Sequence, residues 1–173
     1  AVSLVNWLSA MFVSPQDLPR MDFSEGIPPY AHTLTVVPCM LDKASAVGLL
    51  LEGLEVRYLA NIDANVDFAL LTDFCDASQE TMPEDAALLA QVKNGIEQLN
   101  YKYRRHKDRV FWLFHRPRRW KEREKIWMGY ERKRGKLADL NALLRGRGED
   151  RFQVILGDPA GLQDVKYVIA LDA

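Results

Sequence analysis

Hydrophobic residues form short continuous runs along this chain, and these runs alternate with stretches of helical periodicity. Continuous apolar runs are typical of strands buried on both faces, and they cover residues 34–37, 68–71, 110–114, 152–156 and 167–171. Apolar residues with the i, i+3, i+4, i+7 spacing of a helix face occur within residues 47–54, 89–103 and 137–144. The alternation predicts an α/β domain with a mostly parallel sheet and flanking helices.

The first 30 residues follow a different pattern. Within residues 2–13, Leu4, Leu8 and Phe12 fall on one helical face, and four of the eight prolines lie between positions 14 and 30. We therefore expect an N-terminal amphipathic helix and an extended linker over residues 1–30, followed by the α/β domain over residues 31–173. The helix is too short to span a bilayer, which needs about 20 residues. Its apolar face suits either a membrane interface or packing against the domain.

Local signals predict where one helix begins and where another ends. The sequence Thr-Met-Pro-Glu at positions 81–84 has the spacing of a capping box, so a helix should start there and continue to Tyr103. Gly146 should end the last helix, because glycine readily takes the left-handed conformation found just after helices.

Charge is unevenly distributed, although the whole chain has a net charge of −1. Residues 1–101 carry a net −10 and residues 102–136 a net +11. The basic segment 102–136 could bind an anionic ligand or an acidic partner, or could be a solvated surface matched to the acidic first half. Arg116, Arg118 and nearby tryptophans also leave a nucleic-acid patch open, but Trp112 lies in a predicted strand and is better explained as core.

The cysteines and histidines suggest no catalytic cluster. Cys39 and Cys75 do not make a disulfide framework, and no Cys/His group has zinc spacing. We expect both to be free thiols near the upper ends of adjacent strands, which favours a reducing compartment. The three histidines have no Ser, Cys or Asp at a spacing diagnostic of a hydrolase triad.

Ligands of open α/β sheets bind beyond the carboxyl ends of the strands. Pro38, Asp73 and Asp172 lie at the ends of the first, second and last predicted strands. A carboxylate there can accept hydrogen bonds from a nucleoside or hold a divalent metal, or it can simply cap a helix. Gly135 and Lys136 before a helix could bind phosphate. Because the remaining residues of a P-loop are missing, a solvated helix start is the simpler interpretation.

Several of these segments form an ordered set of motifs: TVVP (35–38), FALLTDF (68–74), HRPRRW (115–120), WMGYERKRGKLADLN (127–141) and YVIALD (167–172). With the lead-in LPRMDFSEGI (18–27), they resemble the glycosyltransferase domain of cyclic β-1,2-glucan synthases over nearly the whole chain. The long motif at 127–141 is the most specific, whereas the short strand motifs are typical of inverting nucleotide-sugar transferases in general.

The resemblance implies the N-terminal part of a GT-A (Rossmann-like) domain, with UDP-glucose as the donor for an inverting β-1,2-glucosyltransferase. It implies a nucleotide-sugar site that includes Pro38. Asp73 matches the uracil-contacting aspartate, and Lys136 and Asn141 match an element beside the nucleotide. Asp172 matches the first aspartate of an Asp-x-Asp motif that holds Mg²⁺ or Mn²⁺.

The resemblance also implies a cellular setting. Family members are large inner-membrane proteins of Gram-negative bacteria, with this domain on the cytoplasmic face and membrane helices outside the matched region. The implied partners are UDP-glucose and the growing β-1,2-glucan, with no nucleic acid. The family continues after the position of Ala173 with a second aspartate, the acceptor site and the general base. We therefore expect the 173 residues alone to be inactive. The alternative is a non-catalytic binding module whose basic segment 102–136 docks an acidic partner or nucleic acid.

Overall fold

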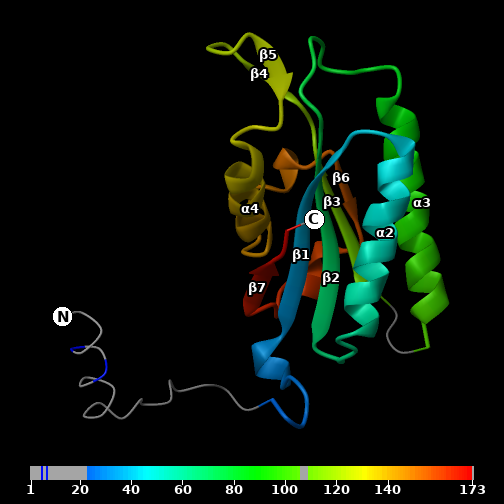
Figure 1. The fold of residues 1–173 in the computed structure, drawn as a ribbon, viewed down its shortest axis with the longest axis vertical. Helices are drawn as coiled ribbons and strands as arrows, with labels where there is room; N and C mark the ends of the chain where they lie inside the picture. The colour runs from blue at the N-terminus through cyan, green and yellow to red at the C-terminus, as the bar shows by residue number, and fades with distance from the viewer. Residues whose placement is uncertain (1–4, 6, 8–22, 106–108, 173) are drawn as a thin grey trace.

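The computed structural model describes residues 5, 7, 23–105 and 109–172 (Figure 1). The expected N-terminal helix therefore lies almost wholly outside the described residues. Two of its members, Val5 and Trp7, are helical and are 60% and 57% exposed. Because Leu4, Leu8 and Phe12 fall outside the described residues, both interpretations of the apolar face stay predictions.

A five-stranded sheet in the order β6-β3-β2-β1-β7 forms the centre of the domain (Figure 1). Its strands are β1 Thr33–Leu41, β2 Val66–Phe74, β3 Phe111–Arg116, β6 Val154–Leu156 and β7 Tyr167–Ala170. β1 is parallel to β2 and β7, and β2 is parallel to β3, whereas β6 is antiparallel to β3. The predicted mostly parallel α/β architecture is confirmed. All residues of β2 and β3 are buried, as their continuous apolar runs predicted.

β1 is longer than predicted. It was expected to end at Pro38, but it continues to Leu41 and pairs with β2 along its whole length. Proline inside a strand removes one ladder hydrogen bond. The Val36 carbonyl accepts from Leu171 on the β7 side, so Pro38, two residues on, also presents its nitrogen to that side. Ala170, the last residue of β7, pairs with Val36, so Pro38 lies where this ladder has ended.

Helices cover both faces of the sheet. α2 Ala44–Leu59 and α3 Asp85–Tyr103 pack on one face, and α4 Arg132–Leu143 packs on the other (Figure 1). Alternate strand residues feed the two cores: Phe68 faces α2 and α3, whereas Leu71 faces the side of α4. Burying one such side chain contributes roughly 1.5–3 kcal/mol. Trp112 is buried in the α4-side core, as predicted.

Short elements complete the described fold. A hairpin that the apolar pattern did not predict joins β4 Arg119–Lys121 to β5 Ile126–Met128. The 3₁₀ helices are η1 Pro29–Ala31, η2 Glu149–Arg151 and η3 Pro159–Leu162. Within the described ranges, no helix is both long and apolar enough to cross a membrane.

The two predicted helix signals had different outcomes. The prediction of a capping box at positions 81–84 is wrong. α3 begins at Asp85, and the Asp85 carboxylate accepts a hydrogen bond from the Met82 N–H at 2.8 Å. The prediction that Gly146 ends the last helix is confirmed. This glycine has φ +71°, and Gly146 and Arg147 donate to the carbonyls of Leu143 and Ala142, which is the hydrogen-bond pattern of a Schellman motif.

Candidate functional site

A pocket of about 180 Å³ lies at the carboxyl ends of β1 and β2, beside the first turns of α4. Three of the predicted site residues, Pro38, Asp73 and Lys136, line it. The other lining residues are Cys39, Met40, Phe74, Asp76, Gly129, Arg132 and Lys133. The pocket therefore occupies the edge of the sheet where a ligand was expected.

Asp73 is the centre of a buried ion cluster in this pocket. Arg116 donates from Nε and Nη2 to its two carboxylate oxygens, each at 2.9 Å. Lys136 Nζ lies 3.1 Å from Asp73 Oδ2 and donates to the carbonyl of Cys39 at 2.7 Å. Both oxygens of Asp73 therefore already contact cations. The carboxylate positions Arg116 and Lys136, and its contact with a nucleotide stays a prediction.

Gly129 makes this cluster possible. A Cβ at position 129 would collide with the carboxylate of Asp73. Gly129 follows β5 directly, so the close approach also fixes the hairpin against the pocket. β5 is tied to the loop after β2 as well, because Trp127 and Ala77 exchange two backbone hydrogen bonds of 2.9 Å.

Asp76 is a pocket residue that the sequence analysis missed. It lies in the loop just after β2, its side chain is partly exposed, and Arg132 Nη2 donates to its Oδ2 at 2.6 Å. Unlike Asp73, it is accessible from the solvent. The available signal was a second aspartate three positions after Asp73. It was overlooked because the predicted strand ended at Asp73, one residue before the observed end at Phe74.

Asp172 lies at the same edge of the sheet. It follows β7, its side chain is 92% exposed, and it forms an ion pair with Lys133. The hydrogen bond from Lys133 lowers the pKa of Asp172 below its ordinary value. Lys133 and Lys136 are one turn apart on α4, so this helix contacts both Asp172 and Asp73. The expectation that Asp73, Lys136 and Asp172 share one edge is confirmed.

Asn141 is not brought to this pocket. It is exposed and lies near the end of α4, about 7.5 Å along the axis from Lys136. Its predicted place beside a nucleotide stays a prediction, and nothing in the structure explains it.

The described residues do not form a metal centre by themselves. No group of three or more His, Cys, Asp or Glu side chains in this part of the chain is arranged to hold a metal ion. Asp172 offers a single exposed carboxylate, and its nearest charged neighbour is the cationic Lys133. Mg²⁺ binds through one or two carboxylates together with substrate phosphates, so the residues here do not fit a complete site.

Both cysteines are free, as predicted. Cys39 is in β1 near the carboxyl edge, and Cys75 follows the adjacent strand β2. Burial raises the pKa of the Cys39 thiol to about 12, so this thiol is a poor nucleophile despite its place in the pocket wall.

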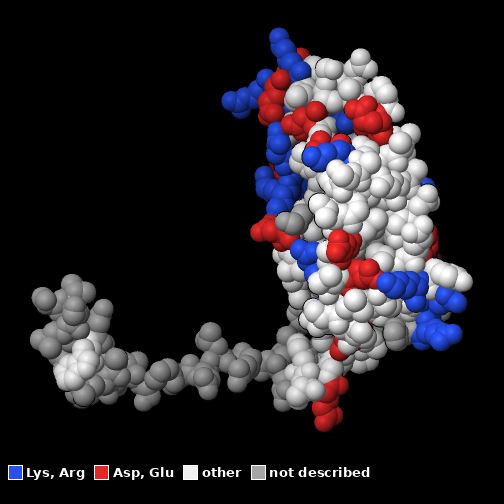
Figure 2. All heavy atoms as spheres, turned by 45° about the vertical axis from the view of Figure 1, so that its right-hand side comes forward, with Lys and Arg blue, Asp and Glu red and all other residues white. Residues whose placement is uncertain are grey.

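Part of the basic segment 102–136 is internal. Arg116, Arg118 and Lys136 are all buried and paired with carboxylates, and Arg118 makes two hydrogen bonds to Asp85. Exposed basic side chains lie at the end of α3, on the hairpin and on α4. Figure 2 shows basic side chains along the left and at the lower right of the view, with acidic side chains among them. This segment therefore contributes to the core as well as to the surface.

The fold and the pocket define a class: a Rossmann-like α/β domain with a charged pocket at the carboxyl edge of its parallel strands. No protein-family model matches the sequence. The cyclic beta-(1,2)-glucan synthase NdvB of Rhizobium meliloti (strain 1021) is 41% identical to this chain over all 173 residues. Residues 1–173 therefore correspond to one segment of a cyclic β-1,2-glucan synthase, which confirms the resemblance of the motifs. The chain spans only 6% of the length of that relative.

Proposed function

We propose that residues 31–173 are the donor-binding portion of an inverting β-1,2-glucosyltransferase that uses UDP-glucose to build cyclic β-1,2-glucan. One observation carries the proposal: α4 pairs with Asp73 in the pocket through Lys136 and with Asp172 at the same edge of the sheet through Lys133. Similarity to a glucan synthase along the whole chain supports the same assignment.

The pocket offers two kinds of chemistry. Asp73 and Asp76 lie at the end of β2, where a carboxylate can accept from the N–H of uracil or from a ribose hydroxyl. Arg132 and Lys133, in the first turn of α4, suit a diphosphate, because the positive end of the helix dipole adds to their charge. Both are held by exposed ion pairs, to Asp76 and Asp172. Such pairs are weak, so a diphosphate could displace the carboxylates.

A divalent cation belongs to the proposal only in part. If Mg²⁺ or Mn²⁺ binds, Asp172 would supply one oxygen ligand, and the cation would neutralise charge on the departing UDP. The described residues do not complete its coordination, so no catalytic step is derived through it. We propose that further ligands, the acceptor site and the general base come from outside residues 1–173, and that these residues alone are inactive.

The proposed setting is the cytoplasmic face of a Gram-negative inner membrane. The growing β-1,2-glucan would be the second substrate, and membrane attachment would come from segments outside this chain. These statements extend the resemblance of the sequence motifs to the glucan-synthase family, and the chain covers 6% of the length of its relative.

Calorimetric titration tests the function. We expect residues 1–173 to bind UDP-glucose with little or no dependence on Mn²⁺, and the full polypeptide to bind it more tightly with Mn²⁺ than without. Asp172→Ala in the full polypeptide should abolish the effect of the metal. Asp164→Ala, another exposed aspartate, is the matched control and should not. A full polypeptide indifferent to Mn²⁺, or an unchanged Asp172→Ala variant, would contradict the assignment of Asp172.

The salt dependence of binding distinguishes the transferase from the alternative, a binding module. The exposed cations of the hairpin and α4 could dock a polyanion, whose affinity should fall steeply as salt rises. A preference for UDP over ADP, with modest salt dependence, would favour the transferase. Tight, salt-sensitive binding of polyanions without that preference would favour the binding module.

A further inference from the structure

Two tryptophans lie side by side on the β4–β5 hairpin. Trp120 of β4 pairs directly with Trp127 of β5, and their ring centroids are 5.8 Å apart. The backbone N–H and carbonyl of Trp127 bond to Ala77, so they point away from β4. The two tryptophans are therefore a pair without hydrogen bonds between them, the arrangement that brings cross-strand side chains closest. Trp127 is partly buried, whereas Trp120 is 45% exposed.

This tryptophan pair adjoins the pocket of about 180 Å³ that is proposed to bind the donor. Trp127 is two residues before Gly129, and its partner Ala77 directly follows Asp76; both Gly129 and Asp76 line that pocket. Figure 1 shows the hairpin beyond the carboxyl ends of the central strands, above α4. The bonds to Ala77 and the close approach of Gly129 to Asp73 hold the hairpin in place. A surface fixed in advance loses less entropy when a ligand binds.

A carboxylate lies at the edge of the Trp120 ring. Trp120 Nε1 donates to Glu122 Oε2 at 2.6 Å, and Glu122 is exposed to solvent. An ionised carboxylate has about four acceptor sites, so this one bond leaves Glu122 able to accept from the hydroxyl groups of a ligand. The hairpin thus combines an aromatic face with hydrogen-bond acceptors beside it.

We propose that Trp120, Trp127 and Glu122 form a binding subsite for the β-1,2-glucan chain, outside the donor pocket. The proposal rests on the proposed function, because it takes the glucan as the second substrate. In a β-linked glucose unit the hydroxyls are equatorial and the ring C–H bonds are axial, so each face of the sugar ring is apolar. Such a face packs against the electron-rich face of an aromatic ring, while the equatorial hydroxyls reach the carboxylate beside it.

Tryptophan suits this role because it supplies a large, rigid contact area at a low cost in conformational entropy. None of the three residues lines the donor pocket, so the subsite does not compete with the nucleotide. Its place next to Gly129 and Asp76 would hold the growing chain close to the site at which it is extended.

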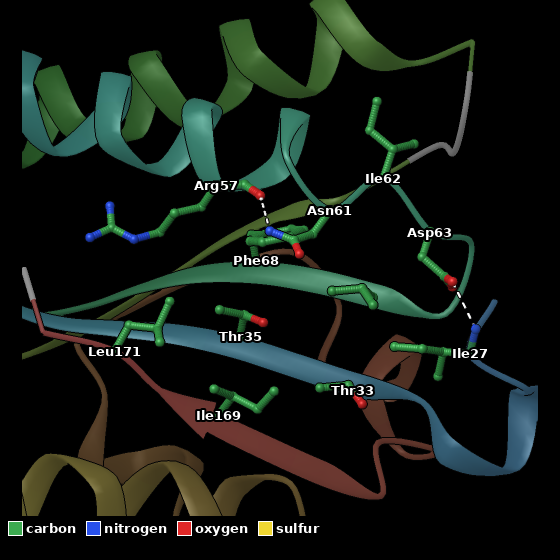
Figure 3. A pocket seen from close by; sticks show the side chains of 11 residues that line it. Ile27, Thr33, Thr35, Arg57, Asn61, Ile62, Asp63, Phe68, Ile169 and Leu171 are labelled. Carbon is green, nitrogen blue, oxygen red and sulfur yellow. Dashed lines mark hydrogen bonds between the residues drawn. The ribbon is translucent and has the colours of Figure 1, made fainter. Parts of the chain in front are cut away.

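A larger cavity elsewhere in the described structure lacks these features. Figure 3 shows this cavity of about 380 Å³, with Arg57 and Asn61 on one side, and Ile169 and Leu171 on the other. The aromatic residue among those that line it is Phe68, which is only 1% exposed. The cavity therefore presents no ring face on which a sugar could stack.

Other roles of the tryptophan pair fit less well. A nucleic acid or an anionic lipid would bring phosphate to the ring edge, where the carboxylate of Glu122 repels it. Cross-strand aromatic pairs also stabilise hairpins. That role requires contact between the two rings, but neither the exposure of Trp120 nor the carboxylate held beside it. A neutral ligand with many hydroxyl groups agrees with all three observations.

Hydroxyl-radical footprinting of the full polypeptide tests the subsite. The probe is a linear β-1,2-glucooligosaccharide, and maltohexaose at the same mass concentration, an α-1,4-linked glucan, corrects for radicals consumed by sugar. Mass spectrometry follows the oxidation of Trp120, with Tyr101 of α3, 69% exposed, as the internal control. Compared with maltohexaose, the β-1,2-glucan should slow the oxidation of Trp120 at least about threefold, because stacking removes the ring from water, and should leave Tyr101 unchanged. Equal oxidation of Trp120 in the two sugars would overturn the proposal.

Two glutamate substitutions separate glucan binding from hairpin structure. Glu122→Gln keeps the size of the side chain but loses a charged acceptor, so the glucan concentration that half-protects Trp120 should rise about tenfold. Glu124→Gln, at an exposed glutamate of the same turn, removes the same charge and should leave that concentration unchanged. Equal effects of the two substitutions would contradict the role of Glu122 and overturn the proposal.

Substitutions of Trp120 test the aromatic face, with the oxidation of Trp127 as the readout. Trp120→Ala should abolish the protection of Trp127 by the β-1,2-glucan, and Trp120→Phe should retain it, because phenylalanine keeps a ring face. Protection that persists in the alanine variant, or is lost in both, would overturn the subsite. UDP-glucose is absent from these measurements. Protection by glucan without any binding of UDP-glucose would therefore reject the proposed donor function while leaving the subsite in place.

Discussion

Arg116 and Asp73 are joined by two hydrogen bonds of 2.9 Å in the interior of the carboxyl edge, from adjacent strands β3 and β2. The planar guanidinium matches the carboxylate in a two-point contact that lysine cannot make. Arg116 also donates to Asp139 of α4 at 2.7 Å and to the Tyr130 carbonyl at 3.1 Å. One arginine thus connects two strands, the turn after the hairpin and the helix that carries Lys136.

Removing Arg116 should unfold the domain more readily. In Arg116→Met, Asp73 keeps only Lys136 as a buried cationic partner, and we expect the free energy of unfolding to fall by about 3–5 kcal/mol. Arg134→Met is the control, because the Arg134 ion pair with Glu131 is largely exposed; its effect should stay within about 0.5 kcal/mol. Urea unfolding measures both. Equal effects of the two substitutions would show that the Arg116 pair contributes nothing specific.

Two glycine substitutions should have opposite effects. In Gly129→Ala the new methyl group collides with the Asp73 carboxylate, so we expect a loss of about 1–3 kcal/mol. In Gly48→Ala, within α2, the added Cβ has no atom within 4 Å, and a gain of about 0.5–1 kcal/mol is expected from helix propensity. Thermal or urea unfolding provides the comparison. A neutral Gly129→Ala would mean that the hairpin is not held tightly against Asp73.

The sequence predicted the parts of the fold that depend on continuous apolar runs. β2 and β3 are buried on both faces, and the continuous apolar runs at 68–71 and 111–114 inside them are easily recognised. The hairpin was missed because its strands are only three residues long, because β4 places tryptophan between two charged residues, and because β5 is held by the distant Ala77. The start of α3 was missed for a similar reason: Asp85 binds Arg118, 33 residues later, a partner that local spacing cannot indicate.

The candidate site was predicted with the same limits. Residues at strand ends were located because parallel strands direct their carboxyl ends to one edge, and Pro38, Asp73 and Asp172 do lie there. The pattern could not show that both oxygens of Asp73 contact cations, since its partners Arg116 and Lys136 come from two other elements. The partner of Asp76, Arg132, likewise comes from another element, so the sequence could not show that Asp76 is more accessible than Asp73.

His115 should make stability depend on pH. Burial lowers the pKa of His115 to about 4, from an ordinary value of 6.5. Between these values the unfolded chain binds a proton that the folded protein does not, so the free energy of unfolding should fall as pH drops from 6.5 to 4. The shift corresponds to about 3 kcal/mol. His115→Gln should remove this part of the pH dependence in urea unfolding, whereas His32→Gln should retain it. An unchanged slope in His115→Gln would contradict the buried, neutral imidazole.

Substitutions of Asp76 and Asp73 should have different effects: the first should weaken nucleotide binding, and the second should reduce stability. Asp73 is buried with both oxygens engaged, whereas Asp76 is partly exposed in the pocket and held by Arg132 through one exposed ion pair. If Asp76 accepts a hydrogen bond from the nucleoside, Asp76→Asn should weaken UDP binding by about tenfold, as expected for a hydrogen bond to a charged group. Its free energy of unfolding should change by less than about 0.5 kcal/mol. Asp73→Asn removes the charge that neutralises Arg116 and Lys136, so we expect a loss of several kcal/mol.

Calorimetric titration of UDP into the full polypeptide, together with urea unfolding of residues 1–173, measures both quantities. Asp150→Asn, an exposed aspartate in η2, controls for the loss of one negative charge. If Asp73→Asn folds normally and loses UDP affinity while Asp76→Asn keeps it, Asp73 contacts the nucleotide directly after its cations rearrange. The distinction between the two carboxylates drawn from burial would then be wrong, because a group enclosed by Arg116 and Lys136 can reach a ligand only if that cluster opens.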